Sequence, residues 1–259
     1  MLSYQHIYHA GNPADVHKHA LLAWMLSYLT RKTKPLSYLE THAGRGLYRL
    51  DTAEALKTGE AASGVAALQS KLPADHPYVQ TLTAIRDQHG PSAYPGSPLL
   101  ASTLLRKGDR LHVAELHPQE HAALAELMRH KAKCYQLDGF EMAHAVAPPE
   151  PRRGMLLIDP SYEIKTDYEI IPAQILKLHR KWNVGVIALW YPILTSGTHA
   201  PMIARLADAN LPGAFQHEIS FPPVRDGHRM TGSGMFVINA PYGVADAAKA
   251  IEPAFAASA

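Results

Sequence analysis

Residues 155–162, with the sequence Met-Leu-Leu-Ile-Asp-Pro-Ser-Tyr, constrain the fold of this chain more than any other stretch. Four consecutive apolar residues between Gly154 and Pro160 predict a fully buried strand of a parallel sheet. Pro160 ends the strand at once, because proline has no N–H for the ladder. Open α/β sheets bind ligands at the carboxyl ends of their strands, so the sequence places Asp159 and Tyr162 at a site.

The end of this strand offers a carboxylate, backbone carbonyls and an aromatic ring close together. Such a set fits a planar group with an amino substituent, because Asp159 and the carbonyl of Pro160 accept its two N–H bonds while Tyr162 stacks on its face. The alternative is that Asp-Pro is an ordinary strand exit and that Tyr162 only packs.

Composition limits the class of protein. The chain has 259 residues, of which 47% are hydrophobic, and a net charge of +2, which suits one elaborated α/β domain or two smaller domains. Its single cysteine, Cys134, excludes an internal disulfide, and we expect a reducing cytoplasmic location. No apolar run approaches the ~20 residues of a membrane span and no secretory signal opens the chain, so we expect no membrane partner.

Acidic residues follow several expected strands. The ranges 36–40, 110–115, 133–137 and 155–158 read as strands, and they end at Glu40, Glu115, Asp138 and Asp159. Acids at neighbouring strand ends can bind ribose hydroxyls and an adenine amino group. Each acid taken alone has the alternative of a solvated strand end or a helix cap.

The histidines and glycines near the amino terminus do not define a site by themselves. A helix is expected from about residue 14 to residue 30, preceded by a polar, broken segment. Four histidines in this part (His6, His9, His17 and His19) lack metal-ligand spacing, so we expect no metal. Gly44 and Gly46 permit close backbone approach to a ligand, but Arg49 replaces the third glycine of a dinucleotide fingerprint.

Residues 49–95 interrupt the alternation of strands and helices, and their Ala-, Leu- and Lys-rich sequence predicts short helices. We therefore divide the chain into an α/β domain, 1–48 and 96–259 with an N-terminal tail at 1–19, and an inserted helical subdomain at 49–95. Helices are expected at 118–128, 167–182 and 199–209, and strands at 184–191, 215–221 and 235–239. The range 222–234 reads as a basic, flexible loop, and the end as a small Ala-rich tail.

Several blocks resemble a known family. Residues 3–4, 9–12, 14–16 and 18–19, then Thr-His-Ala-Gly at 41–44, Tyr-Pro-Gly-Ser-Pro-Leu at 94–99, Trp-Tyr-Pro at 190–192 and Thr-Gly-Ser-Gly-Met at 231–235 are similar to blocks of the bacterial 23S ribosomal RNA adenine-N6 methyltransferases called large-subunit methyltransferase J. The resemblance runs from residue 2 to about residue 242. It implies a Rossmann-like class I S-adenosylmethionine-dependent methyltransferase fold with an inserted helical subdomain.

The resemblance also implies roles for individual residues. The residues implied to bind S-adenosylmethionine are His19, His42, Ser97, Glu115, Asp138, Gly139 and Asp159. Asp159 matches the catalytic residue, with Pro160 and Tyr162 beside it, and Tyr4 matches a residue that touches the RNA. The family has Asp-Pro-Pro-Tyr where this chain has Ser161 in place of the second proline.

These matches imply an enzyme that methylates an adenine N6 amino group of 23S ribosomal RNA. We further expect a cytoplasmic monomer that acts before the subunit is fully assembled. Candidate phosphate contacts are the arginines Arg45, Arg49, Arg152, Arg153, Arg225 and Arg229. Two alternatives stay open. The motif also occurs in DNA adenine and protein glutamine methyltransferases, and Ser161 leaves room for a non-catalytic nucleic-acid-binding relative.

Overall fold

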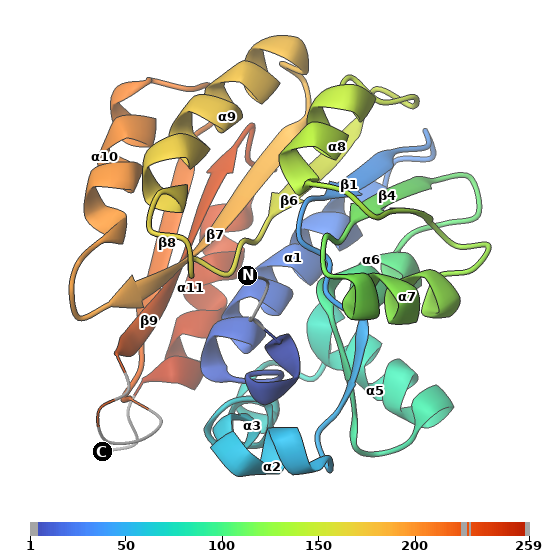
Figure 1. Cartoon of the computed structure of the whole chain (residues 1–259), viewed down its shortest axis with the longest axis vertical. Coiled ribbons are helices and arrows are strands. Elements are labelled where there is room, and N and C mark those ends of the chain that lie inside the picture. Colours follow the sequence, from blue (N-terminus) through green and yellow to red (C-terminus); the bar gives the residue numbers. More distant parts are fainter. Residues whose placement is uncertain (1–4, 224–226, 228, 257–259) are drawn as a thin grey trace.

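The computed structural model describes residues 5–223, 227 and 229–256, and within them seven strands form one sheet between two layers of helices (Figure 1). The order across the sheet is β5 (Lys133–Tyr135), β4 (Arg110–Ala114), β1 (Ser37–Glu40), β6 (Gly154–Ile158), β7 (Val186–Leu194), β9 (Met230–Ile238) and β8 (Phe215–Ser220). Neighbouring strands are parallel except where β9 runs antiparallel to β7 and β8. This topology confirms the expected Rossmann-like class I methyltransferase fold.

Helices cover both faces of the sheet. One face carries α1 (Pro13–Thr30), α6 (Ser97–Leu104), α7 (Pro118–Leu127) and α11 (Val244–Phe255), and the other α8 (Gly139–Val146), α9 (Asp167–Lys181) and α10 (His199–Asp208). Alternate residues of β6 serve the two cores: Leu157 packs on the α1 side, and Leu156 and Ile158 on the α9 side. All five residues of β6 are buried, as its apolar run predicts.

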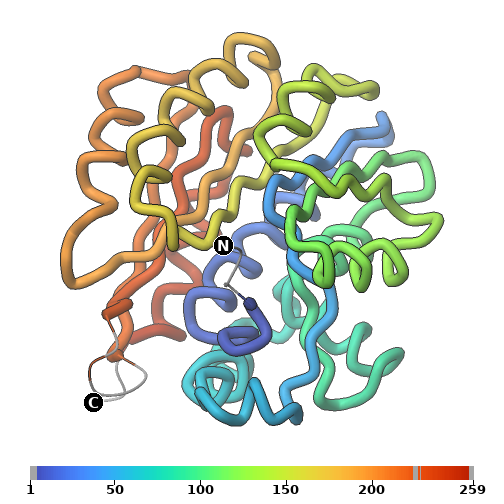
Figure 2. The backbone as a smooth tube through the Cα atoms, in the orientation of Figure 1, coloured from blue at the N-terminus to red at the C-terminus, as the bar shows by residue number. Residues whose placement is uncertain are grey.

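The segment after β1 contains the expected short helices, gathered at one end of the molecule (Figure 2). They are α2 (Ala53–Thr58), α3 (Glu60–Ser63), α4 (Val65–Leu68), the 3₁₀ turn η2 (Gln69–Lys71) and α5 (Pro77–His89). The two ends of the segment are paired by two antiparallel strands that the sequence did not predict, β2 (Leu47–Arg49) and β3 (Ala93–Pro95). Val65 and Leu82 are buried in the same core as α1, and the division into a separate subdomain stays a prediction.

Three local expectations differ from the structure. Residues 230–234 are not loop but the start of β9, where Ser233 is fully buried. Helix α8 was not predicted; Asp138 caps it by accepting hydrogen bonds from the N–H groups of Phe140 and Glu141. The Ala-rich end forms α11, because its apolar residues recur at helical spacing and pack on α1.

The amino-terminal segment crosses the carboxyl edge of the sheet as a 3₁₀ turn, η1 (His6–Tyr8), and then enters α1. Asn12 caps α1 by accepting a hydrogen bond from the N–H of Asp15, and Pro13 occupies the first helical position. Nearly all of α1 is buried, so its polar residues face other parts of the protein rather than water. Within the described residues, no helix is both long enough and apolar enough to span a membrane.

Candidate active site at the carboxyl edge of the sheet

A cavity of about 700 Å³ opens where the carboxyl ends of β1, β4, β6 and β7 meet the amino-terminal part of α1. Its volume is typical of sites for cofactors and small ligands. Many of the residues that the sequence predicts for the site line this cavity. They are His19, His42, Ser97, Glu115, Asp138, Gly139, Asp159, Pro160 and Tyr162. The sheet therefore brings together side chains that lie as far apart in the chain as His19 and Tyr162. Tyr4 lies outside the described residues.

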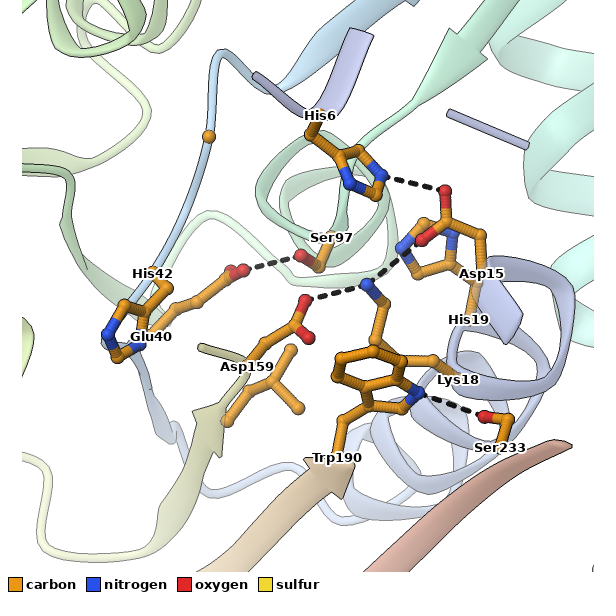
Figure 3. A network of polar contacts seen from close by, with 12 residues as sticks. His6, Asp15, Lys18, His19, Glu40, His42, Ser97, Asp159, Trp190 and Ser233 are labelled. Atoms are coloured by element: carbon orange, nitrogen blue, oxygen red, sulfur yellow. Dashed lines mark hydrogen bonds and ion pairs between the residues drawn. The ribbon is translucent and has the colours of Figure 1, made fainter. Parts of the chain in front are cut away.

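Asp159 is held by a lysine that the sequence did not single out. The Nζ of Lys18 lies 2.6 Å from Oδ2 of Asp159 and 3.0 Å from Oδ1 of Asp15, which sits one turn earlier on α1 (Figure 3). Asp15 also accepts hydrogen bonds from Nε2 of His6 at 2.8 Å and from the N–H of Gly11 at 2.9 Å. The amino-terminal segment is thus tied to the catalytic candidate through one buried ammonium group.

Burial alone lowers the pKa of Lys18, but the nearby carboxylates of Asp15 and Asp159 outweigh it and raise that pKa. Burial raises the pKa of Asp15, yet His6 and Lys18 bring it well below its ordinary value. Asp15 and Lys18 are therefore both charged across the ordinary pH range. Lys18 counts as a missed residue of the site. The available signal was that Asp15 and Lys18, the only acid and the only lysine or arginine of α1, lie three positions apart.

Aromatic rings form the wall beside Asp159. Nζ of Lys18 lies 5.4 Å from the centre of the Trp190 ring, and the indole N–H of Trp190 donates to Oγ of Ser233 at 2.9 Å. The hydroxyl of Tyr162 donates to the carbonyl of Trp190 at 2.7 Å, and its ring lies 4.6 Å from that of Tyr168. Tyr162 has a φ of +56° and is only 8% exposed, so its position is fixed before any ligand binds.

Glu40 differs from the other acids at the strand ends. It is fully buried and lies beneath the cavity rather than in its lining, where the hydroxyls of Ser97 and Tyr38 donate to its two carboxylate oxygens. Burial is the main reason that its pKa rises to about 8, although both hydroxyls act in the opposite direction. The expectation that four acids share the ligand site is thus corrected to three, with Glu40 supporting Ser97 from below.

Glu115 and Asp138 use backbone groups to shape the cavity. Oε2 of Glu115 accepts from the N–H of Gly44 at 2.8 Å and Oε1 from the N–H of His117 at 2.7 Å. Both capping bonds of Asp138 go to Oδ1, and no described residue bonds its Oδ2. Each acid therefore keeps acceptor capacity on the cavity side for a ligand.

Two glycines allow the backbone to approach closely here. A Cβ on Gly139 would lie 2.0 Å from the carbonyl oxygen of Thr41, and one on Gly44 would lie 2.4 Å from the hydroxyl of Tyr48. Gly44 also has a φ of +60°, which other residues rarely adopt. A side chain at either position would push these neighbouring groups apart.

The two lining histidines that the sequence predicts for the site, His19 and His42, have different partners. Nδ1 of His19 lies 3.0 Å from the hydroxyl of Tyr94, whereas its buried Nε2 has no hydrogen-bond partner among the described residues. Burial lowers the pKa of His19 to about 3, so the ring is neutral. Nδ1 of His42 lies 2.7 Å from Oγ1 of Thr41, and burial lowers the pKa of His42 as well.

Most of the candidate phosphate contacts lie elsewhere. Arg45 pairs with Glu120 at 2.6 Å, and Arg49 pairs with Asp51 at 2.8 Å. Arg152 and Arg153 precede β6 and thus stand at the opposite edge of the sheet from Asp159. Arg229 does line the cavity, whereas Arg225 lies outside the described residues. Among the described residues there is no group of three His, Cys, Asp or Glu able to hold a metal ion.

Comparison with known proteins identifies relatives along almost the whole chain. The family model described as "Ribosomal RNA large subunit methyltransferase D, RlmJ" matches residues 33–258. Ribosomal RNA large subunit methyltransferase J of Escherichia coli is 40% identical over 93% of this chain and 88% of the relative. The protein of the same name from Haemophilus influenzae is 38% identical, over 98% and 92%.

Solved structures agree with these matches. A crystal structure from Legionella pneumophila has a TM-score of 0.85 and 35% identity, covering 95% of this chain and 92% of that one. A human methyltransferase-10-domain-containing protein, with 9% identity and a TM-score of 0.50 over 87% and 82% of the two chains, shares the fold alone. The chain belongs to the ribosomal RNA large subunit methyltransferase J family.

Proposed function

We propose that the protein transfers a methyl group from S-adenosylmethionine to the N6 amino group of an adenine in 23S ribosomal RNA. The observation that carries this proposal is the hydrogen bonding of the two carboxylate oxygens of Asp159. One of its carboxylate oxygens is bound by Lys18, no described residue bonds the other, and both Asp159 and Pro160 line the cavity. A carboxylate and a carbonyl side by side match the two N–H donors of an exocyclic amine.

The rest of the cavity fits S-adenosylmethionine. The acceptor capacity of Glu115 and Asp138 suits ribose hydroxyls and an adenine amino group, and the unpartnered Nε2 of His19 offers a buried polar contact. His42, Ser97 and Gly139 complete the set that we propose to hold the cofactor. When bound, the cofactor supplies an electrophilic methyl group on a sulfonium.

The chain's own residues activate the acceptor nitrogen. The lone pair of an adenine amine is delocalised into the ring, so the free amine is a poor nucleophile. By accepting both N–H bonds, Asp159 and the Pro160 carbonyl would favour a pyramidal nitrogen with an available lone pair. The N–C bond would form as the sulfonium S–C bond breaks, and the methylated nitrogen would lose its surplus proton along its hydrogen bond to Asp159.

Lys18 and Asp15 set the charge around that nitrogen. Together with Asp159 they form a group with a net charge of −1, which stabilises the positive charge that develops on the nitrogen during transfer. Lys18 also fixes the carboxylate orientation, because its ammonium holds Oδ2 and leaves Oδ1 for the substrate.

Ribosomal RNA is the substrate that we favour over DNA, because the matched relatives are named as ribosomal RNA large subunit methyltransferases. A base must leave its helix to reach the cavity, and the fixed rings of Tyr162 and Trp190 give it a wall to stack against. We propose that Tyr4 contacts the RNA and that the RNA is recognised before the subunit is complete.

Replacing Asp159 tests the proposal. Asp159→Ala should lower kcat for methyl transfer by at least about a hundredfold, while the Kd of S-adenosylhomocysteine changes less than about tenfold. The matched control is Ser161→Pro, which restores the family's motif next to the same strand end and should keep activity at or above the wild-type rate. Normal methyl transfer by Asp159→Ala would contradict the proposed role of Asp159.

A further inference from the structure

The edge of the sheet opposite the cavity carries a dense group of basic side chains. It is formed by the segments 31–35, 106–110 and 150–153, which lie at the amino-terminal ends of β1, β4 and β6. Its basic members, called here the basic platform, are Arg31, Lys32, Lys34, Arg106, Lys107, Arg110, Arg152 and Arg153. The same segments contain only two acids, Asp109 and Glu150.

Hydrogen bonds join the three segments into one surface. Arg106 and Arg153 each donate to the carbonyl of Lys34 at 3.1 Å. The N–H of Ser37 donates to the carbonyl of Arg153 at 2.9 Å, and the N–H of Arg110 donates to the carbonyl of Leu36 at 2.9 Å. The platform is therefore held in place by the ladder of the sheet itself.

Part of this charge has a structural role. Arg106 and Arg153 donate to the carbonyls of Thr30 and Leu29 at the end of α1, where cations are favoured. Arg106 also pairs with the buried Asp109 at 3.0 Å. These contacts give Arg106 and Arg153 a structural role, but they give none to the exposed lysines of the platform.

The remaining cations are not neutralised by nearby acids. Lys32, Lys34 and Lys107 are exposed, and no carboxylate among the described residues pairs with them. Burial is the main reason that the pKa of Arg153 is lowered, and repulsion from Arg106 acts in the same direction, whereas Asp109 opposes it. Crowding of like charges destabilises the fold unless an anion binds.

Charge is divided between the two edges of the sheet. The platform holds eight of the 25 lysines and arginines, and its segments hold two of the 23 acids, so the rest of the chain has 17 basic and 21 acidic residues. The cavity edge presents the acids Glu115, Asp138 and Asp159. Phosphate groups are consequently attracted to the edge opposite the cavity.

We propose that the basic platform binds the phosphate backbone of the RNA substrate at a segment remote from the target adenine. This inference rests on the proposed function. The five residues of β6 lie between Arg153 and Asp159, and at the rise of an extended strand they separate the two by roughly 20 Å. Helices cover both faces of the sheet between these two edges, so an RNA that binds at both must pass around a layer of helices. A short hairpin with its adenine in the cavity does not extend that far, so the platform acts on long substrates.

The test uses the triple variant Lys32→Gln, Lys34→Gln and Lys107→Gln, in which the backbone carbonyls that bind Arg106 and Arg153 are kept. Its matched control is Lys57→Gln, Lys177→Gln and Lys249→Gln, three exposed lysines elsewhere on the surface. Methyl transfer is measured on protein-free 23S RNA and on the shortest hairpin of it that the wild type methylates, from 50 to 200 mM salt. Unfolding midpoints check that both variants are folded.

The platform variant should raise KM for 23S RNA about tenfold and reduce the slope of log KM against log salt by about 2 to 3, with kcat and the hairpin KM unchanged. The control should match the wild type. Unchanged KM and slope on 23S RNA, equal losses on the hairpin, or an equal effect in the control would each overturn the proposal. If the wild type methylates no RNA, the proposed function fails, and filter binding of 23S RNA over the same salt range still tests the platform.

Discussion

At the scale of single residues, the site depends on charges placed inside a helix. Lys18 is 4% exposed, and its ammonium joins Asp15 on its own helix to Asp159 at the end of β6, 141 residues later in the chain. A buried charge is tolerated only when its partners stay in place. Lys18 therefore contributes to stability and to the orientation of Asp159 at the same time.

Replacing Lys18 by Met should affect both properties. Methyl transfer should fall by about a hundredfold or more, because Asp159 loses its fixed orientation. The free energy of unfolding should fall by about 3 kcal/mol, because Asp15 loses a buried partner. Rapid-quench kinetics and urea unfolding measure the two effects, with Lys57→Met as the exposed control. A wild-type kcat in Lys18→Met would show that this contact has no part in the reaction.

Glu40 predicts a dependence of stability on pH. The pKa of its carboxyl group is about 8 in the folded protein, above its ordinary value of 4.5, so the folded state holds a proton that the unfolded state loses between these values. Stability from this group is complete below about pH 4.5 and is lost as the pH rises through about 8.

Glu40→Gln removes this titration but keeps a planar polar group between Ser97 and Tyr38. The wild type should lose several degrees more in Tm than the variant between pH 5 and pH 9, as measured by calorimetry. Parallel Tm curves for the two proteins over that range would contradict the shifted pKa of Glu40.

At the scale of elements, the cavity depends on how closely α8 approaches the end of β1. Helix α8 begins at Gly139, whose missing side chain lets its backbone meet the carbonyl of Thr41. Asp138, immediately before it, caps the helix and faces the cavity. A shift of this helix start therefore moves a proposed cofactor contact.

Gly139→Ala should raise the Kd of S-adenosylhomocysteine at least about tenfold, because a Cβ at 2.0 Å from a backbone oxygen forces the elements apart. Isothermal titration calorimetry measures the change. Gly108→Ala is the control, since its Cβ would meet nothing closer than Pro35 at 4.0 Å. Equal affinities in the two variants would show that this close approach does not shape the cofactor site.

The sequence predicts the elements of the sheet well and the polar contacts between them poorly. The apolar run of β6 and the proline that ends it lie next to each other in the sequence, so the strand and the site at its end could be predicted. The bond from Lys18 to Asp159 joins distant segments, and only the packing of α1 on the sheet reveals it. Helix α11 was missed because small residues obscure its apolar spacing.

At the scale of the whole molecule, the sheet separates two kinds of surface. The carboxyl edge holds the cavity with its acids, and the amino edge holds the basic platform. An enzyme that acts on one base of a large RNA needs chemistry at one place and phosphate binding over a wider area. The charge separation along the strands meets both needs with a net charge of only +2.

The proposed activity is methylation of an adenine amine in ribosomal RNA. The most direct test is methyl transfer from labelled S-adenosylmethionine to protein-free 23S RNA, to the assembled large subunit and to duplex DNA, followed by nucleoside mass spectrometry. We expect N6-methyladenosine in the free 23S RNA and none in the other two substrates. Methylation of a different nucleoside, or of DNA alone, would contradict the claim, as would the absence of any product while the cofactor still binds.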